Sequence, residues 1–261
     1  MSTLYTGDMK IEQLTAYLRE RLELDKFVAL DSSLNGLQVG RPGKEVKKLG
    51  VAVDASLETF KRGAELKCDA LFVHHGLFWG KPIAITELHY ERIATLLNND
   101  IALLAAHLPL DVHPELGNNA TMARLLGLAE VEPFGYYHGI PIGYRGRFAK
   151  ATTPFEIAKK LGLSSATGLH IMEFGSPEIN TLGIVSGGAP DSLMEAIDLN
   201  LDAFLTGETS HTMYAYCKEA SKTMISGGHY ATEVFGVKEV AKELSAKFSL
   251  ETTFIEFPTA L

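Results

Sequence analysis

The chain has 261 residues, of which 46% are hydrophobic, so it suits one large domain or two small ones and is not expected to be disordered. Its formal net charge of −8 argues against a general nucleic-acid binder or a protein of anionic membrane surfaces. The stretch from Met1 to Lys10 is polar, and no apolar run approaches the roughly 18 residues that span a bilayer, so no membrane partner is expected. The chain has two cysteines and no CxxC motif, which fits the reducing cytoplasm. We therefore predict a cytoplasmic protein.

The first part of the chain alternates helix-like and strand-like patterns. Apolar residues recur at helical spacing from Ile11 to Leu22, and a loop rich in turn-forming residues is predicted from Asp31 to Gly43. The elements predicted next are a strand over Leu49 to Val53, a helix from Ser56 to about Leu66, a strand over Leu71 to Val73, a helix over Glu87 to Leu97 and a strand over Ile101 to Ala106. This alternation is typical of a parallel sheet covered by helices.

The middle of the chain has a different character. Aromatic residues and glycines alternate from Val131 to Lys150, which predicts antiparallel strands or a hairpin. A helix is predicted from about Pro154 to Leu161, and the alternation of strands and helices returns from Leu182 to the end.

Two segments match when the sequence is shifted by 133 residues, from Gly50 to Gly183. Asp69 to Phe72 then falls on Asp202 to Leu205, with low identity but the same strand–helix–strand pattern. Any two βαβ units share such a pattern. The alternative is an internal duplication that gives two related α/β halves, with mainly parallel sheets flanked by helices and a site between them.

Three short patches concentrate residues that bind metals. They are Phe72 to Gly76 with His74 and His75, Ala106 to Asp111 with His107 and Asp111, and Gly227 to Glu233 with His229 and Glu233. In the first two patches a histidine follows a predicted strand, and ligand sites of open α/β sheets lie at the carboxyl ends of strands. In the third, His229 and Glu233 are four residues apart, which places both on one face of a helix.

The donor types define the chemistry. Imidazole nitrogens and carboxylate oxygens suit Zn, Fe, Mn, Co or Ni. Three histidines with one Asp and one Glu exceed the needs of one open catalytic ion, and they suit two ions about 3.5–4 Å apart with a bridging carboxylate. A lone histidine at a strand end is more often structural, but two adjacent ones need polar partners. Because neighbouring strand residues point to opposite faces, the backbone must leave regular strand geometry at His74 and His75 if both are to bind.

With these patches the chain resembles the YbgI-like, or NIF-three-like, dinuclear-metal family, whose members are often labelled GTP cyclohydrolase I type 2 homologues. The motifs that carry the resemblance, in order, are Asn35 to Gly40, Gly50 to Asp54, the His-His-Gly patch, Ala106 to Asp111, Val185 to Gly188, Thr206 to Glu208 and Gly227 to Glu233. The resemblance implies a toroidal homohexamer whose metal sites face an internal cavity. The metal ligands that it implies are His74, His75, Asp111, His229 and Glu233, with Glu233 as the bridge.

Further expectations follow from that ligand set. Because His229 would join ligands from the first half, the first domain should comprise residues 1–128 plus 228–261, and the second 129–227. His107 lies outside the implied set and could hydrogen-bond a ligand, shuttle protons or be purely structural. Glu208 and His211 could line the same cavity or begin a solvated helix. Asn118 and Asn119 are expected to cap the helix after Gly117.

Two classes of function remain open. The first is a metal-dependent hydrolase that uses a metal-bound hydroxide on a small-molecule substrate, such as the guanine ring in a cyclohydrolase reaction, or a phosphoester. The second is a non-enzymatic role in metal storage, metal delivery or a regulatory scaffold. Either would use two divalent ions per subunit. A nucleic-acid clamp is disfavoured by the net charge of −8.

Overall fold

The computed structural model describes residues 9–261, so most of the polar N-terminal stretch lies outside the described residues. The chain forms two compact units. The first comprises the residues up to Leu110 together with Gly236–Phe257. The second comprises Asp111–Phe235 together with Pro258–Leu261. Helices α4 (Leu108–Val112) and α9 (His229–Phe248) each belong to both units. The domain limits expected at residues 128 and 228 both lie within the second unit. Among residues 9–261, no helix has the length and apolarity needed to cross a membrane.

The first unit contains a five-stranded sheet in the order β1-β4-β3-β2-β11. Its strands are β1 (Gly36–Val39), β2 (Lys48–Asp54), β3 (Ala70–His75), β4 (Ala102–Ala105) and β11 (Glu251–Phe254). Only β1 runs antiparallel to its neighbour, so the sheet is mainly parallel. The predicted loop from Asp31 to Gly43 was wrong over β1, because a four-residue edge strand has too few residues to show an alternating pattern.

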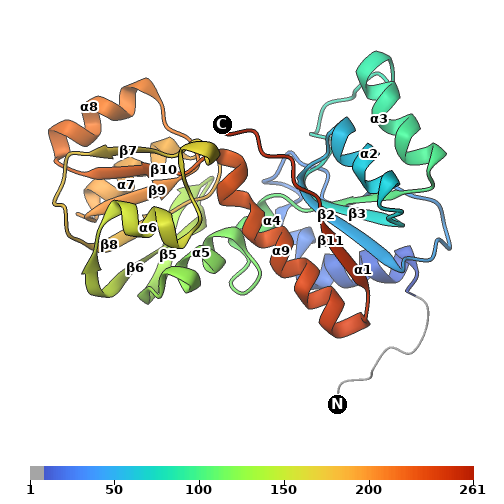
Figure 1. Ribbon diagram of the computed structural model, residues 1–261, viewed down its shortest axis with the longest axis horizontal. Coiled ribbons are helices and arrows are strands. Elements are labelled where there is room, and N and C mark those ends of the chain that lie inside the picture. Colours follow the sequence, from blue (N-terminus) through green and yellow to red (C-terminus); the bar gives the residue numbers. More distant parts are fainter. Residues whose placement is uncertain (1–8) are drawn as a thin grey trace. The chain divides into compact units, whose positions relative to one another are not determined.

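Helices cover both faces of this sheet (Figure 1). The helices that lie wholly within the first unit are α1 (Ile11–Arg21), α2 (Leu57–Glu65), α3 (Glu87–Asn98) and the short 3-10 helix η1 (Leu24–Phe27). Phe60 of α2 and Leu96 of α3 pack on one face in a buried cluster with Leu71 and Leu103. Because side chains alternate along a strand, the intervening residues of β2, β3 and β4 face the other side, where Figure 1 shows α1.

The second unit contains a six-stranded mixed sheet in the order β5-β6-β8-β9-β10-β7. Its strands are β5 (Ala129–Tyr137), β6 (Ile140–Thr152), β7 (His170–Glu173), β8 (Ile179–Ile184), β9 (Ala203–Thr206) and β10 (Thr223–Ser226). Strands β8, β9 and β10 are parallel, and the pairings toward both edges are antiparallel. The hairpin predicted from Val131 to Lys150 is confirmed as β5 and β6.

This sheet is also covered on both faces. Its helices are α5 (Asn118–Leu126), α6 (Pro154–Lys160), α7 (Leu193–Asp198) and α8 (His211–Ala220), with 3-10 turns η2 (Ser165–Thr167) and η3 (Pro190–Ser192). Helices α5 and α6 share one buried apolar cluster with β8, β9 and β10. Helices α7 and α8 share a second cluster with Phe204 of β9 and Met224 of β10. The predicted α/β class, with two sheets flanked by helices, is confirmed.

The two sheets share one pattern of pairing. Gly50 pairs with Leu71 between β2 and β3, and Gly183 pairs with Phe204 between β8 and β9, which is the same register after a shift of 133 residues. The carboxylates that precede β3 and β9 also make equivalent hydrogen bonds to the backbone. Asp69 accepts hydrogen bonds from the backbone of Lys47 and Lys48, and Asp202 accepts them from Asn180 and Thr181. Each of these pairs is separated by the same shift.

Candidate metal centre

The two adjacent histidines stand at the carboxyl end of β3. Pairing with β4 stops at Val73, whereas His75 still pairs with Asp54 of β2. The ring centroids of His74 and His75 lie 4.6 Å apart. Strand β3 extends through His75. The rings approach each other at the strand end, where one neighbouring strand is no longer paired.

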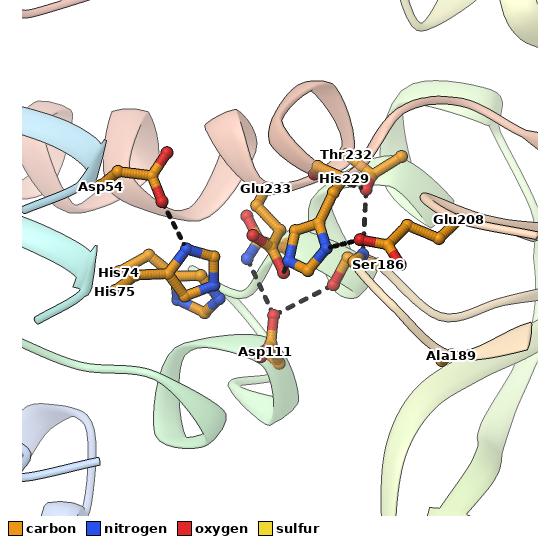
Figure 2. Close-up of polar contacts among 12 residues, drawn as sticks. Asp54, His74, His75, Asp111, Ser186, Ala189, Glu208, His229, Thr232 and Glu233 are labelled. Carbon is orange, nitrogen blue, oxygen red and sulfur yellow. Dashed lines mark hydrogen bonds and ion pairs between the residues drawn. The ribbon is translucent and has the colours of Figure 1, made fainter. Parts of the chain in front are cut away.

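An oxygen acceptor holds each ring in place, and Figure 2 shows the contact between His75 and Asp54. His75 Nδ1 donates to Asp54 Oδ1 at 2.7 Å, and His74 Nδ1 donates to the Ala106 carbonyl at 3.0 Å. Because carboxylate and carbonyl oxygens accept hydrogen bonds, each Nδ1 carries the hydrogen, and a neutral ring then has its lone pair on Nε2. This is the arrangement that second partners impose on metal-binding histidines. Sequence reasoning did not assign this role to Asp54, because Asp54 meets His75 only through the register of β2 with β3.

His107 follows β4 and lies beside the pair. Its Nδ1 donates to Asp31 Oδ1 at 3.0 Å, and its backbone N donates to Asn35 Oδ1 at 2.8 Å. The side chain of Asp31 is 1% exposed. Burial raises the pKa of Asp31, but hydrogen bonds and the charge of His107 outweigh it and hold that pKa below its usual value.

Gln38 also holds the backbone that follows the two adjacent histidines. Gln38 Oε1 accepts from the backbone N of Leu77 at 2.7 Å. A Cβ at Gly76 would lie 2.2 Å from Gln38 Nε2, so a larger residue there would displace this amide from its hydrogen-bonded position. Two residues of the Asn35 to Gly40 motif therefore hold the backbone at the histidine patches, Asn35 at His107 and Gln38 at Leu77.

Asp111 lies on α4 and is buried in the second unit. Its Oδ1 accepts from Asn118 Nδ2 at 2.9 Å and from Ser186 Oγ at 3.0 Å. Asn119 Oδ1 accepts from the backbone N of Ser186 at 2.7 Å. The expected capping role of Asn118 and Asn119 was wrong. Gly117 is the N-cap, and the two buried amides instead hold Asp111 and the Ser186 turn.

The third patch forms the first turn of α9. His229 Nε2 lies 3.2 Å from Glu233 Oε1, and His229 Nδ1 lies 2.5 Å from Glu208 Oε1 (Figure 2). Glu233 is buried, and one of its oxygens lies within 4.8 Å of an oxygen of Asp111. The turn at Gly187 makes room for it, because a Cβ there would lie 2.2 Å from Glu233 Oε1 and its φ is +65°.

Carboxylates dominate the electrostatics of His229. Burial alone would lower its pKa, but the hydrogen bonds and charges of Glu233 and Glu208 outweigh burial and raise the pKa to about 9. The metal-free ring is therefore a cation at neutral pH, held between two carboxylates. From the sequence, Glu208 could line the cavity or begin a solvated helix, and in the structure its carboxylate contacts His229. His211 lies exposed at the start of α8.

The donors present fit divalent transition-metal ions. In the first unit, His74, His75 and His107 each offer a ring nitrogen within 4.8 Å of the others. In the second, an imidazole and two buried carboxylates lie together. Nitrogen and oxygen donors of this kind bind Zn, Mn, Fe, Co or Ni. Within the first unit, the three histidines picked from the sequence thus form a group that could hold a metal ion.

The chain is similar to known proteins over nearly its whole length. The profile of the Duf34/NIF3 (NGG1p interacting factor 3) family matches residues 9–260. The GTP cyclohydrolase 1 type 2 homolog of Treponema pallidum is 39% identical over 286 residues, covering 97% of this chain and 100% of that protein.

Solved structures are similar over the same length. TTHA1606 from Thermus thermophilus has a TM-score of 0.86 and 38% identity, with 97% of this chain and 100% of that chain covered. Protein ybgI, described as of unknown function, has a TM-score of 0.87 and 32% identity, with 97% and 100% covered. The predicted resemblance is confirmed, and the chain belongs to the Duf34/NIF3 (NGG1p interacting factor 3) family.

Proposed function

We propose that this protein holds two divalent metal ions per subunit and acts as a metal-dependent hydrolase. The observation that carries the proposal is that carboxylates hold the rings of two proposed histidine ligands in place. Asp54 holds Nδ1 of His75 and Glu208 holds Nδ1 of His229, as second partners hold the rings of metal-binding histidines. The proposed ligands are His74, His75, Asp111, His229 and Glu233, with Glu233 bridging the two ions.

The residues around these donors define what the chain contributes to hydrolysis. A bound divalent ion lowers the pKa of water toward about 7 and so supplies hydroxide at neutral pH. The chain holds the donors rigid. Asn118 and Ser186 fix Asp111, and Gly187 lets the backbone approach Glu233. Such preorganisation supports catalysis because the site need not rearrange during the reaction.

The substrate class that we propose first is the guanine nucleotide. Relatives of similar length carry the name GTP cyclohydrolase 1 type 2 homolog. Hydrolysis in such a reaction opens the imidazole ring of the guanine base and releases formate. A phosphoester is the other natural substrate of a two-metal site.

One experiment separates the classes of function. The purified protein is stripped of metal and reloaded separately with Zn, Mn, Fe, Co or Ni. Each form is assayed for formate release from GTP and for cleavage of bis-p-nitrophenyl phosphate. Turnover that requires the metal supports the hydrolase. Tight metal binding without turnover of either substrate contradicts it and favours storage, delivery or a scaffold.

The bridging role of Glu233 gives a prediction about stoichiometry. We expect about two ions per chain by elemental analysis after reloading, and one or none in Glu233→Gln, because a neutral amide cannot bridge two cations. Glu219→Gln, an exposed change on α8, serves as the matched control and should keep both ions. Two tightly held ions in Glu233→Gln would show that Glu233 does not bridge.

Assembly gives a second prediction. The family resemblance implies a toroidal homohexamer, and three large apolar residues of α3 support a partner surface, since Leu88, Tyr90 and Leu97 are each more than half exposed. We expect light scattering after gel filtration to give about six times the 28.4 kDa of one chain. A monomeric mass at micromolar concentration would contradict the hexamer.

The proposed location is the cytoplasm. Both cysteines, Cys68 and Cys217, are buried free thiols, and burial raises the pKa of each to about 11. Free thiols in place of disulfides fit a reducing compartment.

A further inference from the structure

A groove lies beside helix α1, and all the residues that line it belong to the first unit. Its walls come from α1, from η1 and the residue after it, from the loop that leads into β1, and from the segment 78–82. Its volume is about 780 Å³, within the range of roughly 300–1,000 Å³ that is typical of small-molecule sites. None of the five proposed metal ligands lines it, and neither does His107. The proposed metal function therefore leaves this groove without a role.

Apolar side chains line much of the groove. Phe78 and Pro82 stand on one wall, and Val28 and Leu34 also line it. Val28 is 76% exposed and Leu34 is 52% exposed. Covering such apolar surface is favourable in water, so a ligand with an apolar part would gain free energy by lying against these two residues.

The walls are fixed before any ligand enters. The backbone N of Leu34 donates to the Phe78 carbonyl at 2.9 Å, which joins the two loops that form the walls. Asp31 accepts hydrogen bonds from the backbone N of Ser33 and from Asn35 Nδ2, both at 2.9 Å, and these bonds hold the first loop. A site that is already ordered loses little conformational entropy when a ligand binds.

Ser33 gives the groove a polar group that needs a partner. The residue is only 6% exposed, and its Oγ is buried without a hydrogen-bond partner among the described residues. Buried hydroxyl groups almost always have a partner, so the partner of this one must come from outside the chain. Because Ser33 lines the groove, a polar atom of a bound ligand can supply that partner.

The charges along the groove favour an anion. Arg19 and Asp25 neutralise each other, since Arg19 Nε donates to both oxygens of Asp25 at 2.9 Å. The side chain of Asp31 is 1% exposed and accepts four hydrogen bonds, so its charge is not presented to a ligand. Lys81 is exposed and has no ion-pair partner within residues 9–261. The charge that remains unpaired at the groove is therefore positive, which complements a negative group on the ligand.

We infer that this groove binds a small amphipathic anion, a molecule with an apolar body and one carboxylate, sulfonate or phosphate group. The apolar body lies against Val28 and Leu34, and the anionic group lies near Lys81. The Ser33 hydroxyl bonds to a polar atom of the ligand. The inference does not depend on bound metal, so its failure would leave the proposed metal function intact.

The first test uses 8-anilinonaphthalene-1-sulfonate, an aromatic anion, as the probe for the full chain. Trp79 is the only tryptophan and lies between two residues that line the groove, so energy transfer from it reports the bound probe. We expect one saturable site per chain. Leu34→Asp should lower affinity about tenfold or more, because it removes an apolar wall and adds a like charge. Leu125→Asp makes the same change at a leucine of equal exposure, 52%, on α5, and should leave binding unchanged. Equal binding by both variants would overturn the inference.

Lys81→Gln tests the anionic group. We expect it to weaken the sulfonate probe about fivefold, the effect of losing an ion pair that is open to solvent. N-phenyl-1-naphthylamine has the same rings without the sulfonate, and its affinity should stay within about twofold. Lys61→Gln, an exposed change on α2, is the control. Equal weakening of both probes, or of neither, would contradict an anion at Lys81.

Ser33→Ala and a set of competitors complete the test. Ser33→Ala should weaken the sulfonate probe about fivefold with no loss in Tm, because its hydroxyl has no partner in the chain to lose. A lower Tm with unchanged probe binding would show that the hydroxyl serves the fold, against the inference. Decanoate and decyl phosphate should each displace the probe at lower concentration than decanol, and the stronger of the two identifies the preferred anionic group. Displacement by all three alike would overturn the inference.

Discussion

At the scale of single residues, the charge state of His229 governs how a metal competes with protons. Its pKa of about 9 means that the metal-free ring holds an extra proton at pH 7.5. A metal bound through this ring must displace that proton. Affinity should therefore increase as pH rises toward about 9 and fall by up to about tenfold per pH unit below it. An ordinary histidine, with a pKa near 6.5, would compete only in more acidic solution.

Replacing one of the two carboxylates tests this account. Glu208→Gln removes a charge that stabilises the cation, so the pKa of His229 should fall from about 9 toward its usual value. NMR titration of the metal-free protein measures that pKa directly. Calorimetry with Zn in two buffers of different ionisation enthalpy should show fewer protons released at pH 7.5 than in the wild type. Glu178→Gln, an exposed change in the same unit, is the control. An unchanged His229 pKa in Glu208→Gln would contradict the assignment.

At the scale of elements, local pattern foretold the strands and helices that carry the candidate ligands. The strand before His74, the hairpin over Val131 to Lys150 and the helical spacing of His229 and Glu233 were all readable, because apolar periodicity and residue spacing are local signals. The partners of these ligands were not. Asp31 lies 76 residues from His107, and Asp54 meets His75 only through strand register. Such pairs depend on tertiary structure, which no single segment encodes.

The internal duplication is also an element-scale question. It stays a prediction, and its best support is the shared register of β2 with β3 and of β8 with β9 under one shift of 133 residues. Two unrelated βαβ units would share handedness and direction. They would have no reason to share both the register and the backbone-binding Asp69 and Asp202 at the same offset.

Helices α1 and α9 are joined within the first unit by a partly buried ion pair. Glu243 of α9 accepts from Arg21 of α1 at 2.9 Å and from the Tyr17 hydroxyl at 2.5 Å. Glu243→Gln should lower the free energy of unfolding by about 1–2 kcal/mol at pH 7, since hydrogen bonds between charged groups are lost. Chemical denaturation measures the difference. The exposed change Glu20→Gln on α1 should have little effect.

The pH dependence of this pair has a definite sign. Burial raises the pKa of Glu243, but Arg21 and Tyr17 outweigh it and hold that pKa below its usual value. A carboxyl with a lowered pKa contributes stability above the unfolded pKa, near 4.5, and loses it as pH falls through the folded value. The difference between wild type and Glu243→Gln should therefore shrink in acid below about pH 4. A difference that grows on acidification would contradict this origin.

At the scale of the whole molecule, the question is whether metal holds the fold together. Each unit has its own apolar core, around Phe60 and Leu71 in the first and around Phe134 and Phe204 in the second. Packing of this kind does not depend on an ion. The candidate metal donors lie at strand ends and helix starts, outside these clusters. Removal of metal should therefore weaken the protein without unfolding it.

Melting curves with and without a chelator at pH 7.5 test this expectation. Ions that bind only the folded state at about 100 times their Kd add about 2.7 kcal/mol, which corresponds to roughly 5–10 °C in Tm for a chain of this size. We expect a shift of that order, reversed by adding Zn back and smaller in Glu233→Gln, which should hold one ion at most. Complete unfolding by the chelator at 25 °C would mean that the ions are structural. That outcome would favour a metal-stabilised scaffold over a hydrolase, because a catalytic site must keep a coordination position open to substrate, whereas a structural site is closed.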